Sequence, residues 1–203
     1  YADIFTGMYA TVAILAALRR RDVTGGGAHV DMALLDAQVA VPANQAANYR
    51  ASGVAPKRMG NGHANVVPYQ AFATADGQLV VAVGNDGQYR KLCAILGEPQ
   101  WGDDPRFATN AARLANRAEL IPLLAAKIAT WEGQPLSLAL EAEGVPAGPI
   151  NDLAGVFADP QVIARGMRFR PEGASIDGVA SPIVIDGERM VAATAAPPLG
   201  GHP

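Results

Sequence analysis

The sequence predicts an α/β fold that carries an inserted, smaller α+β domain. Three observations lead to this prediction. Residues 1–50 have the pattern of Ala-rich helices around a short strand, residues 68–150 begin with an alternating strand pattern, and residues 51–67 between them have no periodicity. With 203 residues, the chain is long enough for one large domain or two small ones.

The first helix is predicted from its apolar spacing. Basic residues at 19–21 suit the negative end of a helix dipole, and the glycines at 25–27 stop the helix. The apolar side chains recur every three or four residues, on one face that this chain alone is not expected to cover: Ile4, Met8, Val12, Leu15 and Leu18.

Asp3 stands at the start of this helix, and the spacing leaves two interpretations open. One is a cap, or a negative charge favoured by the helix dipole. The other is a carboxylate nucleophile near backbone N–H groups that can also receive an oxyanion.

The remaining chain divides by its turn signals. A short strand is expected at residues 29–33, a second helix at 34–49, and a linker or lid loop at 51–67, which is rich in Gly and Pro. Residues 68–150 are predicted to form the small α+β domain, with a tight hairpin at Asp76-Gly77. Its helices are expected over 88–96 with Asp86 as the cap, over 110–128 with Asn110 as the cap, and over 135–143, and residues 144–149 are predicted to form a turn. Residues 151–203 are predicted to return to the large domain through two short helices, introduced by Asp152 and Asp159, and then short strands. The Pro-rich tail at 197–203 is expected to be irregular.

The composition argues against a nucleic-acid partner, an internal disulfide and a metal site. The net charge is −3, and no basic cluster occurs beyond 19–21, so nucleic acid is not an expected partner. The lone Cys93 cannot form an internal disulfide, and its apolar setting predicts a buried structural thiol in a reducing, cytoplasmic environment. His29, His63 and His202 lie far apart, so no metal site is predicted.

No apolar run is expected to reach the length of a membrane span, and no signal peptide is recognisable. The chain begins with Tyr1, inside what has the pattern of an element. We therefore expect a fragment whose N-terminal portion is absent.

Several motifs resemble the family III CoA-transferases, the group that includes formyl-CoA transferase and carnitine CoA-transferase. The resemblance covers nearly the whole chain but only the C-terminal half of a family member, and is greatest for members that act on dicarboxylic acids of the succinyl-CoA type. The motifs follow the family's order: Asp3-Ile-Phe-Thr-Gly7, Thr24-Gly-Gly-Gly-Ala-His-Val-Asp-Met-Ala33, Asn65-Val-Val-Pro-Tyr-Gln-Ala-Phe72, Gly84-Asn85-Asp86, Gly144-Val-Pro-Ala-Gly-Pro-Ile-Asn151, Val156-Phe-Ala-Asp-Pro-Gln161 and Pro197-Pro-Leu-Gly200.

The resemblance implies a Rossmann-like large domain, an interlocked homodimer and Asp3 as the catalytic nucleophile. An acyl-CoA thioester is then a substrate, and no cofactor is bound permanently. CoA moves to a free acid through an aspartyl mixed anhydride and an aspartyl-CoA thioester. Most CoA-binding residues of the family lie in its N-terminal half, so the fragment alone is expected to be inactive.

The resemblance also suggests a lid. Gly60, Asn61, Gly62 and His63 lie where family members carry a glycine-rich segment over the active site, although a plain interdomain linker fits equally well. Tyr69 and Gln70 are candidates to line the cleft or to be structural strand residues. Lys57 and Arg58 are candidates to receive the second carboxylate of a diacid.

Two alternatives remain from the sequence. An α-methylacyl-CoA racemase shares the fold and an equivalent aspartate, but such racemases usually follow it with glycines, whereas here Ile4-Phe5-Thr6 follow. The second alternative is that the chain is a catalytically silent interaction or assembly module.

Overall fold

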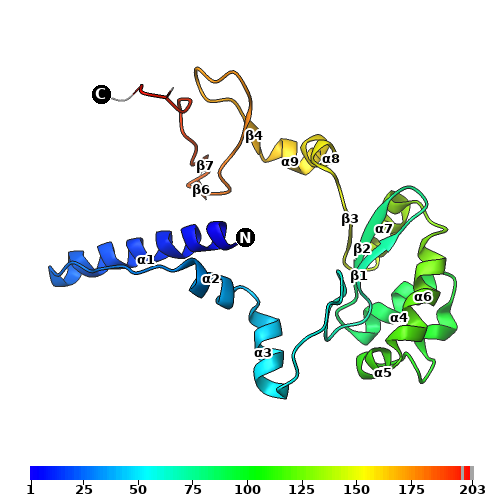
Figure 1. Ribbon diagram of the computed structural model, residues 1–203. Coiled ribbons are helices and arrows are strands. Elements are labelled where there is room, and N and C mark those ends of the chain that lie inside the picture. The colour runs from blue at the N-terminus through cyan, green and yellow to red at the C-terminus, as the bar shows by residue number, and fades with distance from the viewer. Residues whose placement is uncertain (198, 202–203) are drawn as a thin grey trace. The chain divides into compact units, whose positions relative to one another are not determined.

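The computed structural model describes residues 1–197 and 199–201, and its mixture of helices and strands confirms the α/β class (Figure 1). The irregular tail predicted at 197–203 therefore lies partly outside the described residues, as does His202. By its contacts the chain forms two compact units, residues 1–64 and 65–203. The grouping of residues 151–203 with residues 1–50 stays a prediction.

Helix α1 (Ala2–Thr24) opens the first unit and ends as predicted, at Gly25 in the left-handed conformation with φ 74°. None of its residues is buried, and the large apolar side chains point outward, with Ile4 70% and Met8 62% exposed. This confirms the expected uncovered face. The face that packs closer to the rest of the unit is instead made of small side chains: Ala2, Thr6, Ala10, Ala13 and Ala17.

Among the described helices, α1 alone is long and apolar enough to cross a membrane, by these two criteria only. The expectation that no run reaches this length was therefore wrong. The criteria do not separate a span from a helix whose apolar face another part of a soluble protein covers. The absence of a membrane partner stays a prediction.

The chain after α1 differs from the expected strand and single helix. Residues 26–33 are extended but pair with no strand among the described residues. They run back beside α1, since Gly27, Ala28 and Val30 line one hollow with Leu18. The predicted helix over 34–49 is two helices, α2 (Leu34–Ala40) and α3 (Ala43–Ser52). Pro42 separates them because it has no N–H to donate and its ring clashes with the preceding helical turn.

The second unit contains the predicted hairpin, β1 (Tyr69–Ala73) and β2 (Gln78–Ala82), paired antiparallel from Tyr69↔Ala82 to Ala73↔Gln78. Its turn is longer than predicted. The Thr74 N–H donates to the Gly77 carbonyl, and the Asp76 carboxylate accepts from Thr74 Oγ1 and the Gly133 N–H. A third strand, β3 (Ala147–Pro149), pairs with β2 in a stretch predicted to be only a turn.

Helices cover this small sheet: α4 (Asp86–Ile95), the 3-10 helix η1 (Pro99–Gly102), α5 (Asn110–Ala115), α6 (Arg117–Ile128) and α7 (Gly133–Ala142). The long helix predicted over 110–128 is broken at Asn116, whose ψ of 23° is not helical. Side chains one residue earlier than predicted cap two of these helices: Asn85 accepts from the Gln88 N–H and Thr109 from the Ala112 N–H. Fully buried core residues include Leu79, Val81, Leu92, Cys93, Phe107, Leu120, Leu124, Ile128, Leu136 and Leu140.

One charged side chain lies inside this core. Arg113 is fully buried; its guanidinium donates to the carbonyls of Val67 (2.5 Å) and Phe107 (2.9 Å) and to the Asp86 carboxylate (2.8 Å). It also stacks 4.4 Å from the centre of the Tyr89 ring. These contacts satisfy the charge and join segments distant in sequence.

The C-terminal part of the second unit consists of short elements. Asp152 and Asp159 cap α8 (Leu153–Ala158) and α9 (Pro160–Ala164), the two helices predicted there. Strands β4 (Arg168–Phe169) and β5 (Gly178–Val179) pair, as do β6 (Val184–Ile185) and β7 (Glu188–Arg189). Asp186-Gly187, with φ 51° and 86°, makes the two-residue turn between β6 and β7 that was expected at Asp76-Gly77.

We predict that Arg113→Met lowers the free energy of unfolding by about 3 kcal/mol, because two buried carbonyls lose their donor. The matched control is Arg90→Met. Arg90 makes an exposed ion pair with Asp103, so its loss costs less than about 1 kcal/mol. Urea denaturation of both variants measures the difference, and equal losses would contradict the structural role of Arg113.

We predict that Cys93 resists thiol reagents while the protein is folded. Burial raises the pKa of its thiol to about 11, against the smaller lowering effect of the Tyr89 hydroxyl, so roughly one thiol in a thousand is ionised at pH 8. Peptide mass spectrometry after treatment with Ellman's reagent should find Cys93 labelled in guanidinium and almost unlabelled without it. Rapid, complete labelling of the native protein would disprove this.

Candidate functional site

Asp3 lies in the first turn of α1 as an exposed carboxylate. The cap position belongs to Tyr1, and no side chain caps the helix. Within the described part of the chain, the Asp3 carboxylate makes no hydrogen bond and no ion pair. The capping interpretation therefore fails, while attraction to the helix dipole and a nucleophilic role both remain compatible with this position.

The surroundings of Asp3 include backbone donors. The first intrahelical bond of α1 runs from the Phe5 N–H to the Tyr1 carbonyl (3.0 Å). The N–H groups of Asp3 and Ile4 precede it, so they have no acceptor within the helix. An oxyanion near the Asp3 carboxyl carbon would meet donors of this kind.

The predicted lid residues belong to the first unit. Gly60 has φ 62°, a conformation that other residues adopt only with strain, and the Gly62 N–H donates to the Met59 carbonyl (3.2 Å). Asn61 is exposed, whereas Gly62 and His63 are half-buried. No hydrogen bond joins this loop to Asp3 among the described residues.

Lys57 and Arg58 precede the loop, and both are exposed. Neither forms an ion pair within the described residues. The sequence contains no acidic residue between Asp36 and Asp76, so no carboxylate close in sequence competes for these two cations. They are thus available to an anionic ligand.

Tyr69 and Gln70 begin β1 in the second unit, opposite Ala82 and Val81 of β2. Tyr69 is 43% exposed and Gln70 is half-buried. Their strand pairing is compatible with a structural role, and a role in lining the cleft stays a prediction.

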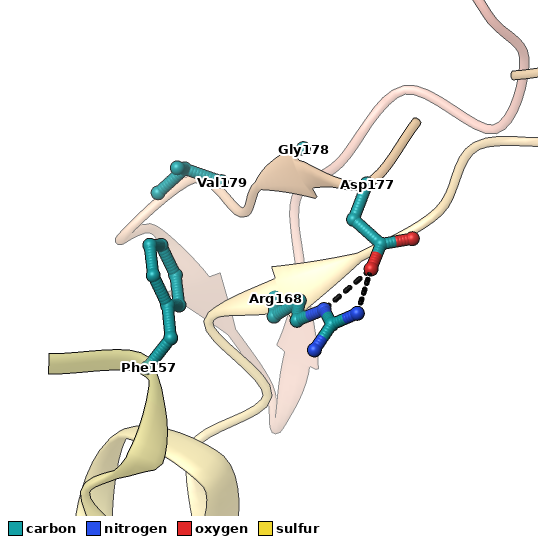
Figure 2. Close-up of a pocket in the computed structure, with 5 residues that line it drawn as sticks. All are labelled: Phe157, Arg168, Asp177, Gly178 and Val179. Atoms are coloured by element: carbon teal, nitrogen blue, oxygen red, sulfur yellow. Dashed lines mark hydrogen bonds and ion pairs between the residues drawn. The ribbon is translucent and has the colours of Figure 1, made fainter. Parts of the chain in front are cut away.

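A pocket of about 260 Å³ lies in the C-terminal part, lined by Phe157, Arg168, Asp177, Gly178 and Val179. Figure 2 shows the Arg168 guanidinium directed at the Asp177 carboxylate at one end, with Phe157 and Val179 at the other. Hydrogen bonds from Arg170 and Arg168 hold the pKa of Asp177 below its usual value. Asp177 therefore stays ionised at neutral pH, paired with Arg168 and Arg170.

No three His, Cys, Asp or Glu side chains gather as metal ligands within residues 1–197 and 199–201. The absence of a metal site stays a prediction, since the three histidines include His202.

Sequence reasoning missed one polar contact beside the predicted lid. The Asn110 side chain, at the start of α5, accepts a hydrogen bond from the Val67 N–H (3.1 Å) and donates one to the Asn65 carbonyl (2.9 Å). The sequence pattern suggested only a helix cap at Asn110, and nothing local indicates a partner more than forty residues earlier.

Comparison with known proteins identifies the relatives of the chain. The sequence model of CoA-transferase family III matches residues 1–203. The chain is 48% identical to the succinate–glutarate CoA-transferase of Agrobacterium fabrum over 204 residues, covering 99% of this chain and 51% of that protein. It is 39% identical to the succinyl-CoA:glutarate CoA-transferase of Homo sapiens over 180 residues, covering 89% and 41%.

A solved structure gives the same result. The crystal structure of a CaiB/BaiF family protein from Brucella suis is 49% identical, with a TM-score of 0.79, and the match covers 97% of this chain and 51% of that one. The chain thus spans about half the length of the curated relatives it matches.

We predict that Asp3→Asn changes the free energy of unfolding by less than about 1 kcal/mol, since only a dipole interaction is lost. Asn85→Ala, which removes a true cap from α4, should cost about 1 kcal/mol or more. Thermal and urea unfolding of the two variants measure this. A larger loss for Asp3→Asn than for Asn85→Ala would show that Asp3 is structural.

Proposed function

The chain belongs to CoA-transferase family III, and we propose that the protein containing it moves CoA from an acyl-CoA donor to a free dicarboxylic acid. The observation that carries this proposal is the 48% identity across 99% of the chain to a succinate–glutarate CoA-transferase. Succinyl-CoA and glutarate are therefore the first donor and acceptor to test.

In the proposed mechanism Asp3 is the nucleophile. Its carboxylate attacks the thioester carbonyl of the donor, the C–S bond breaks, and CoA thiolate leaves behind a mixed anhydride of Asp3 and the donor acid. The thiolate then attacks the Asp3 carbonyl carbon of that anhydride. This releases the donor as its carboxylate and leaves an aspartyl-CoA thioester.

The second half reverses these steps. The acceptor carboxylate attacks the aspartyl-CoA carbonyl and expels CoA thiolate. This step leaves a mixed anhydride of Asp3 and the acceptor. The thiolate attacks the acceptor acyl carbon, so the new acyl-CoA leaves and the Asp3 carboxylate is restored. No proton or external nucleophile is consumed. An exposed, unpaired carboxylate suits this role because it needs no base to activate it.

Both anhydrides react with water, so the site needs a cover. We assign this role to the loop of Gly60, Asn61, Gly62 and His63, in which Gly60 permits the tight turn. Lys57 and Arg58, exposed and without competing carboxylates close in sequence, are proposed to bind the remote carboxylate of the diacid.

The setting of the enzyme follows from the same proposal. Acyl-CoA and a carboxylic acid are its partners, a homodimer is its proposed assembly, and the cytoplasm its proposed location, as the unpaired Cys93 suggests. No permanently bound cofactor is required, because the substrates supply both the acyl group and CoA.

We predict that hydroxylamine, added with succinyl-CoA, converts Asp3 of the full-length protein to a hydroxamate that peptide mass spectrometry locates. Asp3→Asn should lose transfer from succinyl-CoA to glutarate by at least about 10³-fold. Asp36→Asn is the matched control, since Asp36 is also an exposed carboxylate in the first turn of a helix, and its activity should be unchanged.

Two outcomes would overturn the proposal. One is an unmodified Asp3 in protein that hydroxylamine inactivates. The other is exchange of the α-proton of a 2-methylacyl-CoA in D₂O without any acceptor acid, which a racemase performs and a transferase does not.

A further inference from the structure

Residues 53–64, the 53–64 loop, contain the proposed lid residues, and the chain becomes buried just after them. Residues 53–61 are all exposed, whereas Val67 and Pro68 are buried. The point at which the loop becomes fixed is therefore the segment 65–67, which opens the second unit.

Side chains of α5 hold this segment, in place of a paired strand. The Val67 N–H donates to Asn110 Oδ1, and the Val67 carbonyl accepts from Arg113 Nε. Asn110 Nδ2 also donates to the Asn65 carbonyl, two residues earlier. Both polar groups of the Val67 backbone are thus bound by one helix face, since positions 110 and 113 are neighbours at a spacing of three.

Asn110 is not needed as a cap, because Thr109 already accepts the Ala112 N–H (3.2 Å). Its amide is the side-chain type that can donate and accept at once, as the two groups on residues 65 and 67 require. An aspartate offers no donor for the Asn65 carbonyl, and an alanine offers neither contact.

We propose that Asn110 is a positioning residue that fixes the C-terminal end of the 53–64 loop and thereby determines how often acyl groups on Asp3 are lost to water. This rests on the proposed function. In this hydrolysis, water attacks the acyl carbon of the Asp3 anhydride and the acyl C–O bond breaks. The products are the donor acid and the Asp3 carboxylate. The water supplies the oxygen and protons, so the net reaction is acyl-CoA and water to acid and CoA.

The test compares hydrolysis with transfer in the full-length protein. Asn110→Asp should raise the ratio of succinyl-CoA hydrolysis to succinyl-CoA:glutarate transfer by roughly fivefold, the factor expected for the loss of one ordinary hydrogen bond, and Asn110→Ala, which loses two, by more. Thr109→Ala is the matched control on the same helix: it removes a cap but no contact with residues 65–67, so its ratio should equal that of wild type.

A second readout does not need activity. Hydrogen exchange, followed by mass spectrometry on peptides covering residues 53–68, should become faster in Asn110→Ala than in Thr109→Ala. If Asn110→Ala does not fold, Asn110→Asp is tested against the same control with both readouts. Unchanged exchange and an unchanged hydrolysis ratio in a folded Asn110 variant would overturn the proposal. Faster exchange with an unchanged ratio would also overturn it, since Asn110 would then be purely structural.

The two proposals fail in distinguishable ways. A wild-type protein without any transfer activity refutes the proposed function. If the wild type is active and the Asn110 variants have the same ratio of hydrolysis to transfer as Thr109→Ala, only the role of Asn110 is refuted.

Discussion

A full positive charge in an apolar core is tolerated only when its N–H donors form hydrogen bonds. The second unit provides such hydrogen-bond acceptors for the guanidinium of Arg113. The guanidinium binds carbonyls from two loops, Val67 and Phe107, and one carboxylate, Asp86, while its flat face rests on Tyr89. Burying the group without these partners would cost several kcal/mol. The hairpin entry, α4 and α5 must therefore be assembled together, which makes this contact a constraint on the whole unit.

The six residues of α5 matter more than their length suggests. A helix this short has little stability of its own, and what holds it is the buried guanidinium on one turn and the Asn110 amide on the preceding one. Core packing and the fixing of the loop are thus coupled through neighbouring positions of one helix. Substitution of Arg113 or of Asn110 should therefore alter the structure of residues 65–67, at the boundary between the two units in the sequence.

Local signals predicted much of the fold, because caps, turns and apolar spacing act over a few residues. The end of α1 at Gly25, the β1–β2 hairpin and the starts of α8 and α9 at Asp152 and Asp159 followed from them. Errors arose where a distant partner decided the outcome. The dipeptide Asp-Gly occurs at 76–77 and 186–187, but only the second forms a two-residue turn, since the Asp76 carboxylate is held by Gly133 in the first. The buried Arg113 and the Asn110 contacts left no local signal at all.

The candidate site was less accessible to sequence reasoning than the fold. Asp3 and Asp36 have the same local description, an exposed acid in the first turn of a helix without a cap bond, and only the family resemblance separates them. What distinguishes a nucleophile physically is the environment that excludes water and orients the thioester. Here α1 presents its large apolar side chains outward, and the matched relatives are about twice as long as this chain. The local sequence pattern around Asp3 therefore had no means of specifying such an environment.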